Sequence, residues 1–192
     1  MNAPADVPPE SLPESLKGHL LISSGGLFDP NFRHTVVLIG EHGPEGAVGV
    51  VINRPLELTV AETVPPLAGL VPEGEELYEG GPVQPTSPVL LAQVAEPHTP
   101  DVRIFGQIGF LTGDVTPAVG DTLSRARVYA GYSGWGPGQL EAEIAEESWI
   151  IDPAREADIF DTDPESLWSR ILRRKGPEYR QVSRMPFDPN MN

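Results

Sequence analysis

The segment that says most about the fold of this chain is Gly131-Tyr132-Ser133-Gly134-Trp135-Gly136-Pro137-Gly138-Gln139-Leu140-Glu141. It holds four glycines, a proline and two large aromatic side chains within eleven residues. Glycine is used where the backbone needs a positive φ or where another group approaches closely. Proline is favoured in the first helical turn, so the pattern predicts a turn and then a helix that begins near Pro137. Tyr132 and Trp135 beside this turn indicate a contoured surface and not a plain connecting loop.

Apolar runs on both sides of this segment predict a series of strands. They cover residues 18–24, 34–39, 47–53, 88–94, 103–106, 127–131 and 148–152. Runs of β-branched residues bounded by glycine and proline are typical of strands, and the turn cluster at 41–46 predicts a hairpin between its two neighbours. The near-continuous apolar character of the first runs predicts strands that are covered on both faces.

Helix signals are fewer than strand signals. Thr59-Val60-Ala61-Glu62 fits a capping box, a helix is expected over residues 137–147, and residues 64–76 are expected to form an exposed loop. A last helix begins after Asp163-Pro164-Glu165 and ends at Gly176. Its inward-facing residues are Leu167, Trp168, Ile171 and Leu172. Because strands outnumber helices and do not alternate strictly with them, the prediction is an α+β fold with a mixed sheet.

The composition excludes several classes of protein. At 192 residues one domain is expected, and the absence of cysteine excludes disulfides, thiolate metal sites and cysteine nucleophiles. No run approaches the ~18 consecutive apolar residues of a membrane span. Residues 1–16 are rich in proline and glutamate, lack the features of a secretion signal, and are expected to be a disordered lead-in. We therefore expect a cytoplasmic protein without membrane association.

The charge is unevenly spread along the chain. From Arg170 onward the sequence contains six basic and two acidic residues, a local net charge of +4. Because the whole chain carries −15, residues 1–169 carry −19. An acidic body repels the phosphate backbone of a nucleic acid, which makes direct nucleic-acid binding an unfavoured hypothesis. The basic segment is better explained as a helix end whose cations complement the helix dipole.

Known catalytic motifs are matched only in part. Gly131-Tyr132-Ser133-Gly134-Trp135 resembles a nucleophile elbow, but Trp135 replaces its second glycine, so Ser133 is better explained as a turn or capping hydroxyl. The amides at Gly138 and Gln139 could hold an anion at the helix start, although nearby glutamates could satisfy the same dipole. The four histidines lack metalloenzyme spacing. The sequence therefore predicts no catalytic residue, no metal site and no cofactor.

Two segments indicate binding more directly. Val51-Ile52-Asn53-Arg54-Pro55 is an apolar strand that ends in an amide and a guanidinium, and a guanidinium suits carboxylate or phosphate ligands. Glu79-Gly80-Gly81-Pro82-Val83-Gln84 is a second glycine-rich turn with a polar end. Binding sites are often built at such strand ends and turns. The alternative, equally weighted, is that Arg54 pairs with a nearby glutamate and the glycines only shape turns.

Taken together, four blocks of sequence resemble the YqgE/AlgH family of bacterial proteins. The blocks are residues 26–38, 46–55, 80–83 and 132–143, and the resemblance covers roughly residues 18–172. Tyr132-Ser133 stands where many members of the family have Tyr-Ala, which weakens a role for Ser133 as nucleophile. On this basis residues 17–176 form the YqgE/AlgH-like domain and residues 177–192 a C-terminal tail.

The resemblance implies an α/β protein whose mixed sheet bends into a partly open pseudo-barrel with flanking helices, and a cytosolic location. It implies no known reaction, and the family carries an inherited label of transcriptional regulator. This sequence gives that label little support, because it has no helix-turn-helix signature and no basic recognition helix.

Three hypotheses for the function remain. The first is a non-enzymatic module that binds a small ligand or a protein partner. Its candidate residues are Asn53, Arg54, Gly81, Gln84, Trp135, Gly138 and Gln139. The second is an unrecognised hydrolase or transferase that uses residues 131–141, with Ser133 or His34 as the chemical group and the Gly138–Gln139 amides as an anion hole. The third is a DNA-binding regulator that acts through residues 170–184.

Overall fold

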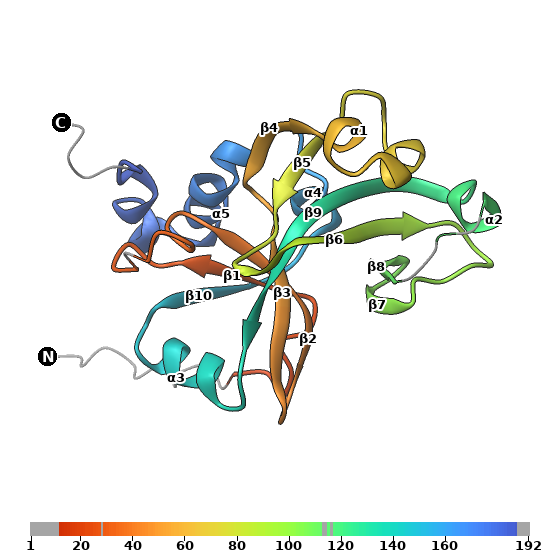
Figure 1. The fold of residues 1–192 in the computed structure, drawn as a ribbon. Helices are drawn as coiled ribbons and strands as arrows, with labels where there is room; N and C mark the ends of the chain where they lie inside the picture. Colours follow the sequence, from red (N-terminus) through yellow and green to blue (C-terminus); the bar gives the residue numbers. More distant parts are fainter. Residues whose placement is uncertain (1–11, 28, 113–114, 116, 188–192) are drawn as a thin grey trace, which may run out of the picture.

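A computed structural model describes residues 12–27, 29–112, 115 and 117–187. Within these residues ten strands form one sheet that does not close on itself (Figure 1). The strands are β1 (His19–Ser23), β2 (Val36–Gly43), β3 (Gly46–Val51), β4 (Pro55–Thr59), β5 (Glu76–Glu79), β6 (Val83–Val94), β7 (Val102–Phe105), β8 (Ile108–Leu111), β9 (Leu123–Trp135) and β10 (Trp149–Pro153).

The order of hydrogen-bonded strands is β10-β1-β2-β3-β9-β6-β8-β7, with β5 also paired to β9 and β4 paired to β5. The β5–β9 pair is parallel, whereas the other recorded pairs are antiparallel. The sheet is therefore mixed and open, which confirms the predicted fold class. The predicted hairpin is also present, because β2 and β3 are antiparallel neighbours joined by a turn at residues 44–45.

Strand β9 belongs to both halves of the sheet. Its residues 123–132 pair with β6, and its residues 133–135 pair with β3 (Figure 1). The strand changes direction at Gly131, which has a φ of +69°. A Cβ atom there would lie 2.7 Å from the carbonyl oxygens of Gly81 and Val83, so only glycine lets these two backbones cross. Both predicted reasons for glycine apply at Gly131, a positive φ and a close approach, and the turn predicted before the helix lies at Pro137-Gly138.

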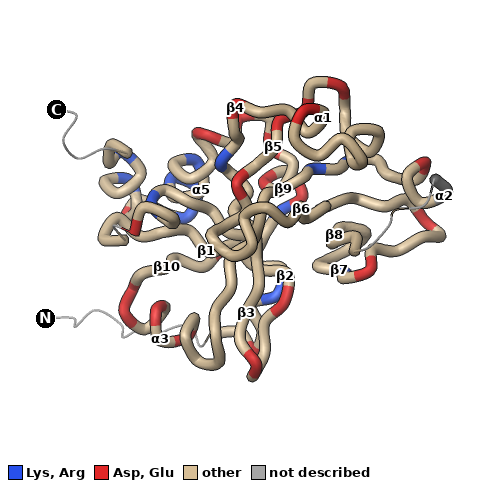
Figure 2. The backbone as a smooth tube through the Cα atoms, viewed as in Figure 1, with Lys and Arg blue, Asp and Glu red and all other residues tan. Residues whose placement is uncertain are grey.

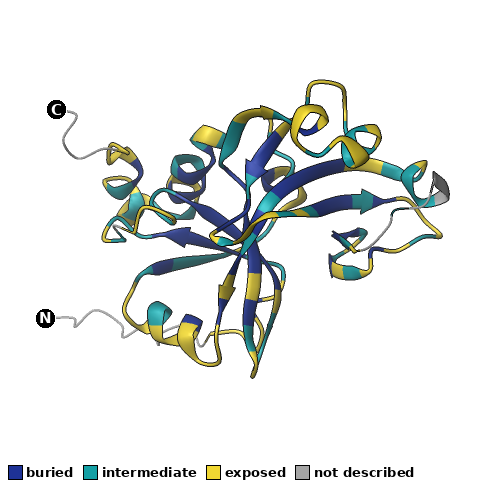
Figure 3. Cartoon of the chain, in the orientation of Figure 1, coloured by how far each residue is buried: buried dark blue, intermediate teal, exposed yellow. Residues whose placement is uncertain are grey.

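In the first half of the sheet, β10-β1-β2-β3, strands β1, β2 and β3 are covered on both faces over most of their length, as predicted, with Val48 as an exposed exception (Figure 3). Side chains of successive residues point to opposite faces of a strand, so Leu20 and Leu21 join different apolar clusters. One cluster contains α5 (Leu167–Lys175), and the other contains Leu16, Trp135, Leu140 and Trp149 beside α3 (Gln139–Ala145). A third cluster lies in the second half, under η1 (Pro65–Leu70).

The other helices are short: α1 (Val60–Thr63), α2 (Pro117–Gly120), α4 (Glu156–Ile159), η2 (Pro164–Ser166), η3 (Pro177–Tyr179) and η4 (Val182–Arg184). The capping box at Thr59 and Glu62 is present. Helix α5 buries its four predicted residues and ends at Gly176, and α3 begins two residues after Pro137, with Gly138 at its N-cap. Among the described residues no helix is both long and apolar enough to cross a membrane.

Both ends of the described chain pack on the domain. Leu16, the last residue of the predicted lead-in, is buried, and its backbone N–H donates to His42. Residues 1–11 of that lead-in lie outside the described residues. Of the predicted tail, residues 177–187 are described and contain η3 and η4, with Tyr179 and Val182 against the core. Residues 188–192 lie outside the described part.

Candidate functional site

The predicted site residues fall into three separate environments. Asn53 and Arg54 line a pocket of about 560 Å³ together with His34, Glu79 and Phe187, which we call the polar pocket. Trp135, Gly138 and Gln139 lie at the start of α3, beside an apolar cluster to which none of the polar-pocket residues belongs. Gly81 and Gln84 lie at the start of β6, where this segment passes close to Tyr132 of β9.

Arg54 holds the loop that precedes β2. Its Nη1 donates to the carbonyl of Asn31 at 2.8 Å, and its Nη2 donates to the carbonyls of Arg33 at 2.9 Å and Pro30 at 3.1 Å. Nη1 also lies 3.4 Å from Glu79 Oε2. The alternative in which Arg54 pairs with a glutamate is thus present in the structure, and most of the guanidinium donors serve the loop.

Asn53 fixes the same loop from the other side. Its Oδ1 accepts from the backbone N–H of Val36 at 2.8 Å, and its Nδ2 donates to the carbonyl of His34 at 2.9 Å. These two bonds use the amide to join the end of β3 to the entry of β2. Asn53 is buried and lines the polar pocket, and its side-chain amide is engaged in these two bonds.

His34 is the strained residue of the polar pocket. Its φ is +52°, a region that residues other than glycine rarely adopt, and such strain is concentrated at functional sites. The imidazole stacks on Trp168 at 3.8 Å between ring centroids, and the edge of Phe187 closes the pocket. Burial, then the cations of Arg33 and Arg54, lowers the pKa of His34 below its ordinary value of 6.5, so the ring is neutral at pH 7.

The start of α3 is a hydrogen-bonded unit centred on Glu143. Trp135 and Trp149 both donate their indole N–H to Glu143 Oε2, and Gln139 Nε2 donates to Glu143 Oε1 at 3.0 Å. Gln139 Oε1 accepts from Gly136 N–H, while the backbone N–H of Gln139 donates to the Gly136 carbonyl at 3.1 Å. The Gln139 amide assigned to an anion hole is therefore already used within the turn.

Ser133 is buried within β9, and its hydroxyl donates to the Gly80 carbonyl at 3.2 Å. The residue therefore acts as an internal link across the crossing of β9 with Gly80–Gly81, where the sequence predicted a turn or capping hydroxyl. His34, the other proposed chemical group, stacks on Trp168 in the polar pocket. The structure thus places Ser133, His34 and the Gly138–Gln139 turn in different packing environments. Gln84, with a φ of +48°, is exposed at the same crossing.

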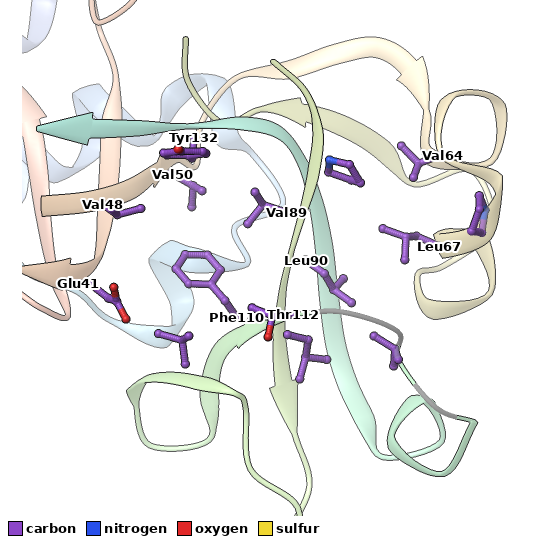
Figure 4. A pocket seen from close by; sticks show the side chains of 15 residues that line it. Glu41, Val48, Val50, Val64, Leu67, Val89, Leu90, Phe110, Thr112 and Tyr132 are labelled. Atoms are coloured by element: carbon purple, nitrogen blue, oxygen red, sulfur yellow. The ribbon is translucent and has the colours of Figure 1, made fainter. Parts of the chain in front are cut away.

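The largest of the recorded hollows is one that the sequence did not indicate. It has a volume of about 650 Å³ and lies where the bent sheet brings its two halves together (Figure 4). We call it the apolar cavity. Its walls come from β3, β6, β8 and η1 through Val48, Val50, Val89, Leu90, Phe110 and Leu67. Figure 4 shows Glu41 and Val48 on one side of the hollow and Val64 and Leu67 on the other.

Few polar groups reach the apolar cavity. They are the Glu41 carboxylate, the Tyr132 hydroxyl and Thr112 (Figure 4). Thr112 is already bound, because its N–H and its hydroxyl donate to Asp101 Oδ2 at 2.7 and 3.3 Å. Glu41 is exposed and, within the described part of the chain, forms no recorded ion pair or side-chain hydrogen bond. An unpaired carboxylate therefore stands at the rim of a hollow with mostly apolar walls.

The sequence analysis missed this cavity because its walls are distant in the sequence and meet only through the bend at Gly131. One signal was available. Val48 and Val50 are two residues apart and share a face of β3, yet Val48 is 38% exposed whereas Val50 is buried. An apolar run predicts that other residues cover this face of the strand, but it does not show at which residue that cover ends.

Half of the cations of the basic C-terminal segment are paired inside the molecule. Three of its six cations form ion pairs with the acidic body: Arg170 with Asp161 and Asp163, Arg174 with Asp152 and Asp158, and Lys175 with Asp152. Figure 2 shows the basic residues gathered on α5. The acidic body therefore takes up charge that a phosphate backbone would need.

Comparison with known proteins gives one consistent family. A family model described as AlgH-like matches residues 20–180. A UPF0301 protein of Streptomyces avermitilis is 37% identical over 185 residues, which cover 93% of this chain and 96% of the relative. A UPF0301 protein of Thermobifida fusca is 38% identical over 190 residues, with the same two shares.

Two solved structures share the fold. The crystal structure of protein DIP2367 from Corynebacterium diphtheriae has a TM-score of 0.78 and 25% identity, and the match covers 88% of this chain and 91% of that one. The solution structure of AlgH from Pseudomonas aeruginosa has a TM-score of 0.66 and 32% identity, with 93% and 98% covered. The chain belongs to the AlgH-like family, and the names of these relatives state no activity.

Proposed function

We propose that this AlgH-like protein is a non-enzymatic binding module that holds a small, largely apolar ligand in the apolar cavity. One observation carries the proposal: the bend of the sheet leaves a hollow of about 650 Å³ whose walls come from both halves. Pockets for small molecules are usually concave, mostly apolar and between about 300 and 1,000 Å³ in volume. A ligand here would contact Val48 and Val89 on different strands.

The rim of the cavity suggests the polar end of the ligand. The unpaired Glu41 carboxylate favours a hydrogen-bond donor or an amine, and it disfavours a carboxylate ligand. An ion pair at an exposed carboxylate contributes only about 0–1 kcal/mol, whereas each buried methylene contributes about 0.8 kcal/mol. The apolar body of the ligand would therefore supply most of the affinity, and Glu41 would select its orientation.

The same lining argues for binding without chemistry. Among the described residues that line the cavity, Glu41 and Tyr132 are titratable, and none is a histidine, lysine or arginine. A nucleophile needs a general base within hydrogen-bond reach, and these wall residues offer no such pair. We therefore place the protein among binding modules.

The proposal is tested with the neutral apolar dye N-phenyl-1-naphthylamine, whose fluorescence rises in an apolar pocket. Val48 and Leu58 are both apolar, on strands and exposed, by 38% and 50%, but only Val48 lines the cavity. Val48→Trp fills the hollow and should weaken dye binding by about tenfold or more, equivalent to about 1.4 kcal/mol. Leu58→Trp should bind as the wild type does. Equal binding by both variants, or no binding by the wild type, would refute the proposal.

The role of Glu41 is tested by displacement of the dye with n-octylamine, n-octanol and n-octanoate, which share one alkyl chain. The amine should displace the dye best and the acid worst. Glu41→Gln should lower the advantage of the amine over the alcohol by up to about fivefold, because an exposed ion pair is weak. An unchanged advantage of the amine over the alcohol in Glu41→Gln would leave the cavity as an apolar site and show that Glu41 does not select the ligand.

A further inference from the structure

Strand β10 ends the sheet on one side. In the described part of the chain its recorded strand partner is β1, in an unbroken antiparallel register from His19 opposite Pro153 to Ser23 opposite Trp149. Figure 1 shows its outer edge between α3 and the segment that follows α5. A free strand edge presents backbone donors and acceptors to any strand that can reach it.

The hydrogen bonds that flank β10 show which of its backbone groups are free. The N–H of Ser24 donates to the Ser148 carbonyl at 2.9 Å, and the N–H of Ala154 donates to the Gly18 carbonyl at 3.0 Å. Backbone groups of successive residues point to opposite edges of a strand, so the even-numbered residues of β10 face β1. Trp149 and Ile151 therefore face outward, and no recorded hydrogen bond in the described residues uses their N–H or C=O groups.

A groove follows this edge. It has a volume of about 430 Å³, and both Ile150 and Ile151 line it. Because successive side chains of a strand point to opposite faces, a hollow that touches both must lie along the edge. Its other walls come from α3 and the segment after α5, through Ile144, Tyr179 and Val182, and from Ser24 and Gly25 after β1. We call it the β10 groove.

The charge of the surroundings limits what can enter the β10 groove. Glu147 lines it and is exposed, with Glu146 exposed beside it. Lys175 also lines it, but its Nζ lies 3.6 Å from Asp152 Oδ1 and is paired. The α3 side of the groove is therefore acidic, whereas the segment after α5 on the other side belongs to residues 170–192, whose net charge is +4. A basic side chain of a bound segment would meet opposite charge on the α3 side.

From these contacts we infer that the outer edge of β10 binds an extended peptide of a partner protein, with an apolar side chain in the β10 groove and a basic side chain toward Glu147. The peptide would add a strand to the sheet by pairing with the free groups of Trp149 and Ile151. Pro153, which also faces outward, has no N–H, so the pairing ends there. The inference concerns a protein partner and is independent of the ligand in the apolar cavity.

Amide hydrogen exchange on the full chain tests the inference, with a short synthetic peptide of alternating valine and lysine as the probe. In the free protein the amides of Trp149 and Ile151 should exchange about 100-fold faster than those of Ile150 and Asp152, because the latter bond to β1. Saturating peptide should slow Trp149 and Ile151 by about tenfold or more. The same peptide with every backbone nitrogen methylated keeps its side chains and charge and should give no protection.

A matched pair of variants tests the same backbone group from the protein side. Ile151→Pro removes one outward-facing N–H, and Ile151→Val keeps it. The proline variant should lose protection of Trp149 by the peptide, and the valine variant should retain it. If the proline variant does not fold, the methylated peptide on the wild-type protein decides the question.

Three outcomes would overturn the inference. The methylated peptide could protect these amides as well as the unmodified one, which would mean charge attraction without strand pairing. Ile151→Pro could fold and bind the peptide as Ile151→Val does. Alternatively, Trp149 and Ile151 could be protected without peptide, increasingly at higher protein concentration, which would show that a second copy covers the edge.

Discussion

The indole nitrogens of Trp135 and Trp149 donate to one and the same carboxylate oxygen, Oε2 of Glu143, at 2.9 and 2.8 Å. The two rings meet edge to face at 6.0 Å between centroids, and Phe32 contacts both of them. A single acceptor thus satisfies two donors of buried side chains that come from different strands. The glycine-rich segment of the sequence is tied to β10 through this carboxylate.

The first prediction concerns this shared acceptor. Glu143→Ala leaves the two indole N–H groups without a partner, and each such loss costs about 1–3 kcal/mol. We expect the free energy of unfolding, measured with urea, to fall by about 2–4 kcal/mol. Glu146→Ala, three residues on and exposed, should change it by less than about 0.5 kcal/mol. Similar values for the two variants would show that the shared carboxylate contributes nothing beyond an ordinary surface residue.

A second prediction separates the role of Arg54 in the fold from a role in binding. Arg54→Ala removes donors to the carbonyls of Pro30, Asn31 and Arg33, so we expect a loss of about 2–4 kcal/mol in unfolding free energy. Phe32 lies inside this loop and packs on Trp135, so its ring should gain mobility in nuclear magnetic resonance spectra. Dye binding in the apolar cavity should persist at temperatures where the variant is folded. An Arg54→Ala protein as stable as the wild type would contradict this structural role.

The comparison of sequence with structure shows where local pattern is sufficient. The four buried residues of α5 and the capping box at Thr59 depend on spacing within one element, and both predictions were confirmed. The strands of the first half were found because their apolar runs are nearly continuous. Strands β4, β5 and β8 were missed because each has only four or five residues, too few for a clear apolar pattern. This holds even for β8, although it pairs with β7, its neighbour in the sequence.

The glycine-rich segment shows the limit of that approach. A run of glycines predicts either a turn or a close approach of two backbones, and only the partner strand decides between them. Here Gly131 lies against Gly81 and Val83, about 50 residues earlier in the chain, a contact without a local signature. The apolar cavity is missed for the same reason. Asn53 and Arg54 do share one pocket, because they are neighbours at the end of a strand.

A third prediction follows from His34. The pKa of this group is lowered in the folded state, mainly by burial, so the unfolded chain takes up the proton first as the pH falls below 6.5. The stability that the neutral ring contributes is therefore complete above about pH 6.5 and is lost as the pH falls toward the folded pKa. In urea unfolding between about pH 8 and pH 5, the wild type should lose more stability than His34→Asn does. Asparagine tolerates a positive φ, so this variant keeps the backbone.

The histidine signal itself provides the control for this effect. In a nuclear magnetic resonance titration of the folded protein, the ring of His34 should titrate below pH 6.5, whatever other groups do to the stability. A midpoint at or above 6.5 would contradict the prediction, as would equal pH dependence of unfolding in the two proteins.

The last prediction separates backbone strain from collision at the crossing of β9. Gly131 and Gly138 have nearly the same φ, +69° and +72°, but they differ in their surroundings. A Cβ at Gly131 meets the carbonyl oxygens of Gly81 and Val83 at 2.7 Å, whereas a Cβ at Gly138 has no atom within 4 Å. Alanine at either position bears the left-handed backbone cost of about 1 kcal/mol. Gly131→Ala must also push two backbones apart.

We expect Gly138→Ala to lower the free energy of unfolding by about 1 kcal/mol and Gly131→Ala to lower it by about 3 kcal/mol or more. Because the bend at Gly131 also forms the apolar cavity, this variant should bind N-phenyl-1-naphthylamine more weakly even at temperatures where it is folded. Gly138 lies outside that cavity, so its alanine variant should bind the dye normally. Equal losses of stability would mean that the positive φ alone explains why residue 131 is glycine. Normal dye binding by a folded Gly131→Ala protein would show that the apolar cavity does not depend on the bend.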